Sequence, residues 1–162
     1  MKTKQIALLK LASAFTDKKE VRAYCTIINV CNNTMRATNG YIAIEIQSQL
    51  SIADGNYSAN SIDNVYKTGL INLLEREEEN CKYPEFRFFN LIDHSKELGG
   101  EYLLSNEYTY RVSKALHVLS ADLGIKLLRV AHSEVYNGIS ASIQEIRLDK
   151  IIIKIAIMPL KQ

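Results

Sequence analysis

The sequence has few cysteines, little net charge and no long apolar run. Its three cysteines are an odd number and form no Cys-x-x-Cys pair, which favours a reducing cytoplasm over a secreted disulfide framework. No segment approaches the roughly 18 uninterrupted apolar residues that a membrane helix needs, so no membrane partner is expected. Lys10 interrupts the apolar stretch behind the basic start, which predicts a folded helix there and not a signal peptide.

Motifs that carry catalytic chemistry are also missing. There is no Walker A loop, Gly-x-Gly-x-x-Gly motif, nucleophile elbow or His-Glu-x-x-His motif. His94, His117 and His132 have no metal-ligand spacing among themselves or with the cysteines. The sequence therefore predicts a protein that binds without catalysis and uses no metal or cofactor. An enzyme with an unrecognised site is the less favoured alternative.

The chain has the length and composition of about one domain. It contains 162 residues, of which 47% are hydrophobic and 23% are charged, as in an ordinary soluble globular protein. The net charge of +2 is too small to indicate nucleic-acid binding by itself. However, residues 1–40 are rich in lysine and arginine, and residues 75–101 are rich in glutamate. Such a chain can present a cation-rich face while staying nearly neutral.

Hydrophobic periodicity predicts three helices, over residues 4–15, 61–74 and about 106–121. In the first of them Lys10 falls outside the apolar arc and should face away from the core. Strands are indicated by β-branched runs and by alternation, and the turns between them by Asn and Gly, which tolerate a left-handed backbone. The predicted strands cover residues 22–31, 34–38, 41–47 and 147–157, with turns at Asn32-Asn33, Asn39-Gly40 and Asp54-Gly55.

Hairpin connections predict an α+β fold, in which an antiparallel sheet is covered on one face by helices. Both ends of the chain read as a helix followed by strands, which suggests two duplicated helix-plus-antiparallel-sheet units. We therefore expect residues 1–162 to form a single domain. Its first half would be residues 1–80, its linker residues 81–104 and its second half residues 105–162.

Three segments resemble the bacterial DNA polymerase III beta subunit, the DNA sliding clamp. Residues 21–41 resemble its strand, hairpin and "ATDG" turn, residues 81–87 resemble its "FPDY-R" linker, and residues 157–161 resemble its "MPMR" tail. The chain departs from the family in three ways. It is long enough for little more than one of the clamp's three domains, the strands expected between the helix at 61–74 and the Tyr83-Pro84 linker are missing, and Asn39 replaces the usual aspartate. The resemblance implies a DNA-clamp-like fold.

The same resemblance implies two functional surfaces. One is a helical face near duplex DNA, where lysine and arginine side chains would lie close to phosphates without reading sequence. The other is an apolar pocket for linear peptide motifs of DNA polymerase or other replication proteins. The DNA-facing candidates are Lys2, Lys4, Lys10, Lys67, Arg111 and Lys114. The pocket candidates are Thr38, Gly40, Tyr41, Ala43, Met158, Pro159 and Leu160.

The function implied is a processivity or partner-recruitment role in DNA replication, with chains assembled into a homo-oligomeric ring. The shortness and the Asn/Ile/Lys-rich composition suggest a phage or other mobile element as the source. The alternative is a monomeric clamp mimic that binds clamp-binding peptides or replisome proteins without encircling DNA. A plainer interpretation stands beside both: each lysine is a solvated helix residue, Gly40 only makes a turn and Met158 only fills the core.

Overall fold

The computed structural model describes residues 3–77, 83–86, 89, 105–126, 130–134 and 142–158. Within these residues the chain forms three α-helices and one eight-stranded sheet, so the predicted α+β class is confirmed. Every pairing in the sheet is antiparallel. In this part of the chain, no helix has the length and apolar character to span a membrane.

The helices are α1 (Lys4–Ser13), α2 (Ala59–Thr68) and α3 (Asn106–Leu123), with short 3₁₀ turns at Ala23–Cys25 and Ile71–Leu73. The strands are β1 (Ile27–Cys31), β2 (Thr34–Thr38), β3 (Ile42–Gln47), β4 (Gly55–Ser58), β5 (Arg76–Glu77), β6 (Val130–Glu134), β7 (Ser142–Leu148) and β8 (Ile151–Ile157). Their order across the sheet is β5-β4-β1-β2-β3-β8-β7-β6.

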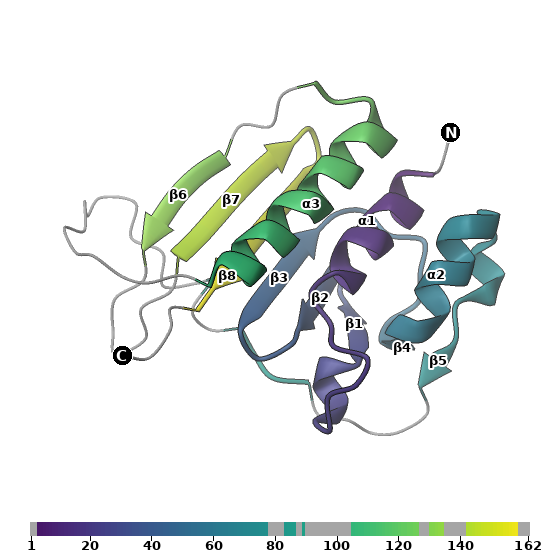
Figure 1. Cartoon of the computed structure of the whole chain (residues 1–162). Helices are drawn as coiled ribbons and strands as arrows, with labels where there is room; N and C mark the ends of the chain where they lie inside the picture. Colours follow the sequence, from purple (N-terminus) through teal and green to yellow (C-terminus); the bar gives the residue numbers. More distant parts are fainter. Residues whose placement is uncertain are drawn as a thin grey trace.

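The two halves of the chain share a helix followed by three strands, to which the first half adds β4, α2 and β5. Helix α1 is followed by the antiparallel strands β1, β2 and β3, and helix α3 is followed by β6, β7 and β8. The halves join where β3 pairs with β8, from Ile42 opposite Ile157 to Gln47 opposite Ile152. Figure 1 shows α1 and α3 side by side across one face of this sheet, running in opposite directions.

The main core lies between the sheet and the helices. Alternation along β3 buries Ile42, Ile44 and Ile46 on the helix-covered face. On β8 every second residue from Ile151 to Ile157 is an isoleucine buried on the same face. The apolar arcs predicted for α1 and α3 are buried against them, which confirms those two predictions. The buried members are Leu8, Leu11 and Ala12 on α1, Phe15 just after α1, and Val112, Ala115, Leu116 and Leu119 on α3.

The second helix is shorter than predicted. The segment expected to be helical to residue 74 ends at Thr68, because Gly69 adopts a left-handed backbone with φ of 77° and closes the helix. Leu70 and Leu73, which continue the helical period in the sequence, are 53% and 40% exposed. The periodicity beyond Gly69 was therefore misleading.

Two predicted strands also need correction. The segment 147–157 contains a hairpin: β7 ends at Leu148, Asp149 adopts a positive φ of 50°, and β8 starts at Ile151. In the segment 22–31 a 3₁₀ turn precedes β1, so Cys25 lies in that turn and not on the strand with Cys31. Most of the predicted linker, residues 81–104, lies outside the described residues.

Candidate nucleic-acid interface

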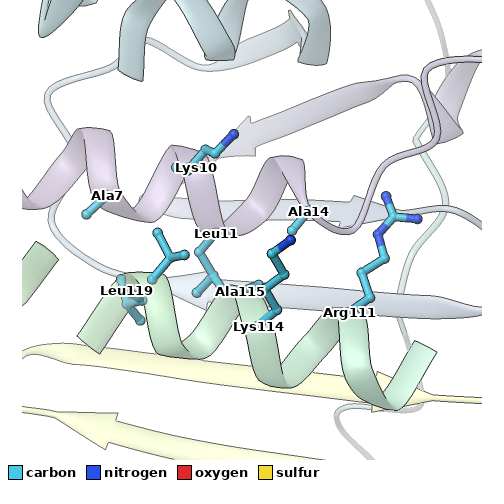
Figure 2. A pocket seen from close by; sticks show the side chains of 9 residues that line it. Ala7, Lys10, Leu11, Ala14, Arg111, Lys114, Ala115 and Leu119 are labelled. Carbon is cyan, nitrogen blue, oxygen red and sulfur yellow. The ribbon is translucent and has the colours of Figure 1, made fainter. Parts of the chain in front are cut away.

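A groove runs between α1 and α3 on the surface of the helical layer. It encloses a hollow of about 160 Å³. Figure 2 shows that side chains from both helices line it, with Ala7 and Leu119 near one end and Ala14 and Arg111 near the other. The lining consists of Ala7, Lys10, Leu11, Ala14, Arg111, Lys114, Ala115, Val118 and Leu119.

Three of the six DNA-facing candidates meet at this groove. Lys10 comes from the last turn of α1, and Arg111 and Lys114 come from one face of α3, three residues apart. Residues about a hundred positions apart in sequence are thus brought together by the pairing of the two halves. The groove lining contains these three cations and no acidic side chain.

The three cations differ in how they are held. Arg111 donates a hydrogen bond to the carbonyl oxygen of Thr16, which ties α3 to the segment after α1. Lys10 lies 2.7 Å from the Asp63 carboxylate and 5.4 Å from the centre of the Tyr66 ring. Lys114 is exposed and forms no ion pair with any side chain that the structure describes. It is the cation of the three with the most freedom to meet an anion.

Asp63 on α2 moderates the positive field of the groove. Its two carboxylate oxygens accept hydrogen bonds from Lys10 and Lys18, at 2.7 and 2.8 Å. The hydrogen bonds from Lys10 and then Lys18 lower the pKa of Asp63 to about 2. Asp63 therefore stays ionised at any ordinary pH and offsets part of the charge of Lys10. The pKa of the neighbouring Tyr66 hydroxyl is raised, first by burial and then by its hydrogen bond to Asp122.

Acid should weaken the fold through Asp63. Because its pKa is about 2 when folded against an ordinary 3.8, its contribution to stability is complete above pH 4 and is lost as the pH falls towards 2. The side chains of Lys10 and Asp63 are 34% and 42% exposed, so the contribution is under about 1 kcal/mol. Urea unfolding of the wild type and of Asp63→Asn at pH 7 and pH 2.5 measures it. The stability difference between the two proteins at pH 7 should shrink at pH 2.5, and a constant difference would contradict the assignment.

The remaining DNA-facing candidates lie elsewhere. Lys4 is exposed at the first residue of α1, and Lys67 is exposed in the last turn of α2, but neither lines the groove. Lys2 lies outside the described residues. The groove therefore gathers half of the predicted set.

The predicted peptide pocket requires the tail that begins at Met158 to lie beside the Asn-Gly turn. The two lie next to each other. The backbone N–H of Met158 donates to the carbonyl oxygen of Tyr41 at 2.8 Å, directly beyond the last pair of β3 and β8. The Tyr41 side chain is 52% exposed and stacks on Tyr108 of α3, with ring centres 5.3 Å apart and planes 14° apart. Pro159 and Leu160 lie outside the described residues.

The Asn-Gly turn itself is held by side chains from within it. The Asn39 carboxamide oxygen accepts from the backbone N–H of Tyr41 and of Ile42, both at 2.9 Å, a geometry that an aspartate would offer equally. The Thr38 hydroxyl donates to the Ile42 carbonyl oxygen. Gly40 has φ of 91°, a left-handed backbone conformation that favours glycine, and the Arg22 guanidinium lies over it, 2.8 Å from where a Cβ would be.

Ala43 lies on the opposite face of the sheet from the helices. There it is buried in a second apolar cluster with Ile143, Ala156, Phe86 and Phe89, against which Met158 packs. Tyr41 contacts α3, whereas Met158 contacts this cluster. The structure thus joins the pocket candidates through the backbone but directs their side chains to different neighbours.

Comparisons with known proteins do not identify a relative. No family model, curated protein or solved structure matches the chain. The resemblance to sliding clamps therefore stays a hypothesis that depends on the residues themselves.

Sequence reasoning missed the apolar part of the groove. Ala7, Ala14 and Val118 leave the hollow open because they are small or short, and the helical spacing of Ala7, Leu11 and Ala14 was the available signal. The stacking of Tyr108 on Tyr41 was likewise not predicted. His117 is exposed on α3, and the described residues contain no cluster of three or more potential metal ligands.

Proposed function

We propose that this chain is a non-catalytic, DNA-associated binding protein built like one domain of a sliding clamp, with the layer of α1 and α3 facing duplex DNA. The observation that carries the proposal is the meeting of Lys10, Arg111 and Lys114 around one groove without an acidic side chain in its lining. Such a surface suits phosphates, which it can contact without reading the bases.

The repeated order of elements gives independent support. A helix followed by an antiparallel three-stranded unit occurs twice, and the two units are joined edge to edge by β3 and β8 so that their helices lie together. A plan with paired helices on one side of a continuous sheet is what the resemblance implies. To surround DNA, a chain of this size would assemble head to tail into a closed ring.

Sedimentation with and without a duplex, at several salt concentrations, tests the proposal. We expect an oligomer, or oligomerisation on DNA, and an affinity that falls steeply with salt. Three phosphate contacts per chain predict a slope of log K against log salt of about −2.7. A strict monomer that does not bind duplex DNA at low salt would contradict the proposal.

The second candidate is a monomeric clamp mimic that captures clamp-binding peptides. The hydrogen bond between Met158 and Tyr41 favours it, because it sets the turn and the tail beside each other. The burial of Ala43 under Phe86 and Phe89 opposes it, since that apolar surface is already covered. A fluorescent polymerase-derived clamp-binding peptide should bind the wild type and lose binding with Tyr41→Ala or Met158→Ala. No binding to the wild type would exclude this function.

A further inference from the structure

The groove lies between α1 and α3, the two helices that occupy corresponding places in the two halves of the chain. Some buried positions of α1 and of the residues just after it recur in α3 with an offset of 104 residues, as from Leu8 to Val112 and from Phe15 to Leu119, whereas buried Leu9 corresponds to exposed Ser113. The same offset relates Lys10 to Lys114 and Leu11 to Ala115, so these four residues occupy equivalent places in the two helices.

The hollow exists because corresponding side chains of the two helices differ in size. Where α1 presents Leu11, α3 presents the much smaller Ala115, and Ala7 and Ala14 flank the same space from α1. Figure 2 shows Leu11 and Ala115 in the middle of the groove, between the two helix backbones. A hollow of about 160 Å³ compares with the roughly 150 Å³ of a cavity that holds a benzene-sized group, so one large aliphatic side chain would fit.

The lining has two kinds of chemistry. Its floor is apolar, with Leu11, Ala115 and Leu119 among its members, and the charged residues of its lining are all cationic, although Asp63 outside the lining pairs with Lys10. A DNA backbone would satisfy the rim alone, because a phosphodiester has no apolar group that could fill the floor. A ligand with an apolar side chain next to a carboxylate would satisfy both.

We propose that the groove between α1 and α3 also binds an acidic peptide, which inserts one leucine-sized side chain into the hollow and places a neighbouring carboxylate against Lys114. Charge complementarity selects this partner: Lys114 has no ionic partner among the described residues, and Arg111 lies at the same rim, whereas the Lys10 ammonium points away from the hollow towards Asp63. Lys10 and Arg111 are already engaged with Asp63 and Thr16, so Lys114 makes the main contact.

The proposal goes beyond DNA binding, and it predicts competition between the two ligands. Both use Lys114, but only the peptide uses the apolar floor. A variant that fills the hollow should therefore weaken peptide binding more than DNA binding. A variant that removes the charge of Lys114 should weaken both. Ala14 is suited to the first change, because it is only partly buried and larger side chains there point into the hollow.

A labelled twelve-residue peptide of glutamate and alanine with one central leucine serves as the probe in fluorescence polarisation with the full chain. The matched peptide has alanine in place of leucine. We expect the leucine peptide to bind at least tenfold more tightly, in line with the burial of one large aliphatic side chain. Equal binding of the two peptides, or no binding up to roughly 1 mM, would overturn the proposal.

Variants of the groove complete the test. Ala14→Leu should weaken the leucine peptide about tenfold, to the affinity of the alanine peptide, whereas Lys114→Gln should weaken both the leucine peptide and a duplex. Val118→Phe fills the hollow from α3 and should repeat the result of Ala14→Leu, with thermal melting as the check that both variants fold. Unchanged peptide binding in the folded filled variants would overturn the proposal. The duplex measurement tests DNA binding separately, so failure of one proposal is distinguishable from failure of the other.

Discussion

Lys114→Glu is expected to lower the affinity for duplex DNA by about tenfold at low salt, because it removes one phosphate contact and adds a repulsive charge. Adding Lys10→Gln should extend the loss by less than about a further tenfold, because Asp63 already offsets part of the charge of Lys10. Lys114 is preferred to Arg111 for this test because Arg111 also holds the Thr16 carbonyl and its loss would disturb the structure. Polarisation titrations with a fluorescent duplex at two salt concentrations measure the effect.

Lys150→Glu is the matched control, since it makes the same change in charge in the exposed turn between β7 and β8, at the sheet and away from the groove. It should change the affinity by less than about twofold. Lys114 is exposed without an ion pair in the described structure, so its replacement should alter stability by no more than about 0.5 kcal/mol. Equal losses for Lys114→Glu and Lys150→Glu would show that DNA responds to net charge and not to the groove.

Local signals in the sequence predicted much of the fold. The alternation of Ile42, Ile44 and Ile46 fixed one face of β3, and the Asn-Gly pair fixed the turn before it. The predictions failed where a turn did not interrupt the apolar period. Asp149 makes the hairpin between β7 and β8 with no glycine beside it, and Leu70 continues a helical spacing after Gly69 has already ended α2. The helix end and the hairpin turn each depend on the backbone conformation of a single residue, which hydrophobic periodicity does not reveal.

The candidate groove was only partly predictable, for a different reason. Lys10 and Lys114 could be assigned to the outer faces of two helices, but their proximity depends on the pairing of β3 with β8, a contact between distant segments. The neutralising contact of Asp63 with Lys10 likewise depends on how α2 packs against α1. A lysine on a helix surface therefore gives no indication, by sequence alone, of whether its charge is free or already paired.

Phe89→Ala should lower the free energy of unfolding by about 3 to 5 kcal/mol, the range for removing a buried phenyl ring. Phe89 is 2% exposed and packs edge to face on Phe86, with ring centres 5.8 Å apart, over Ala43, Ile143 and Ala156. The two rings thus cover the face of β8 opposite the helices at Ala156. Chemical denaturation monitored by circular dichroism measures the loss.

Tyr110→Ala is the control for this prediction, because it removes a comparable ring that is 67% exposed, and it should change stability by less than about 0.5 kcal/mol. The size of the Phe89 effect also decides between two functions of the surface around Ala43. A large loss identifies the cluster as core, which leaves the helical groove as the place for partners. A loss below about 1 kcal/mol, together with tighter binding of a clamp-binding peptide, would instead identify Phe89 as a displaceable cover over a peptide site. That result would favour the monomeric clamp mimic over the DNA-binding ring.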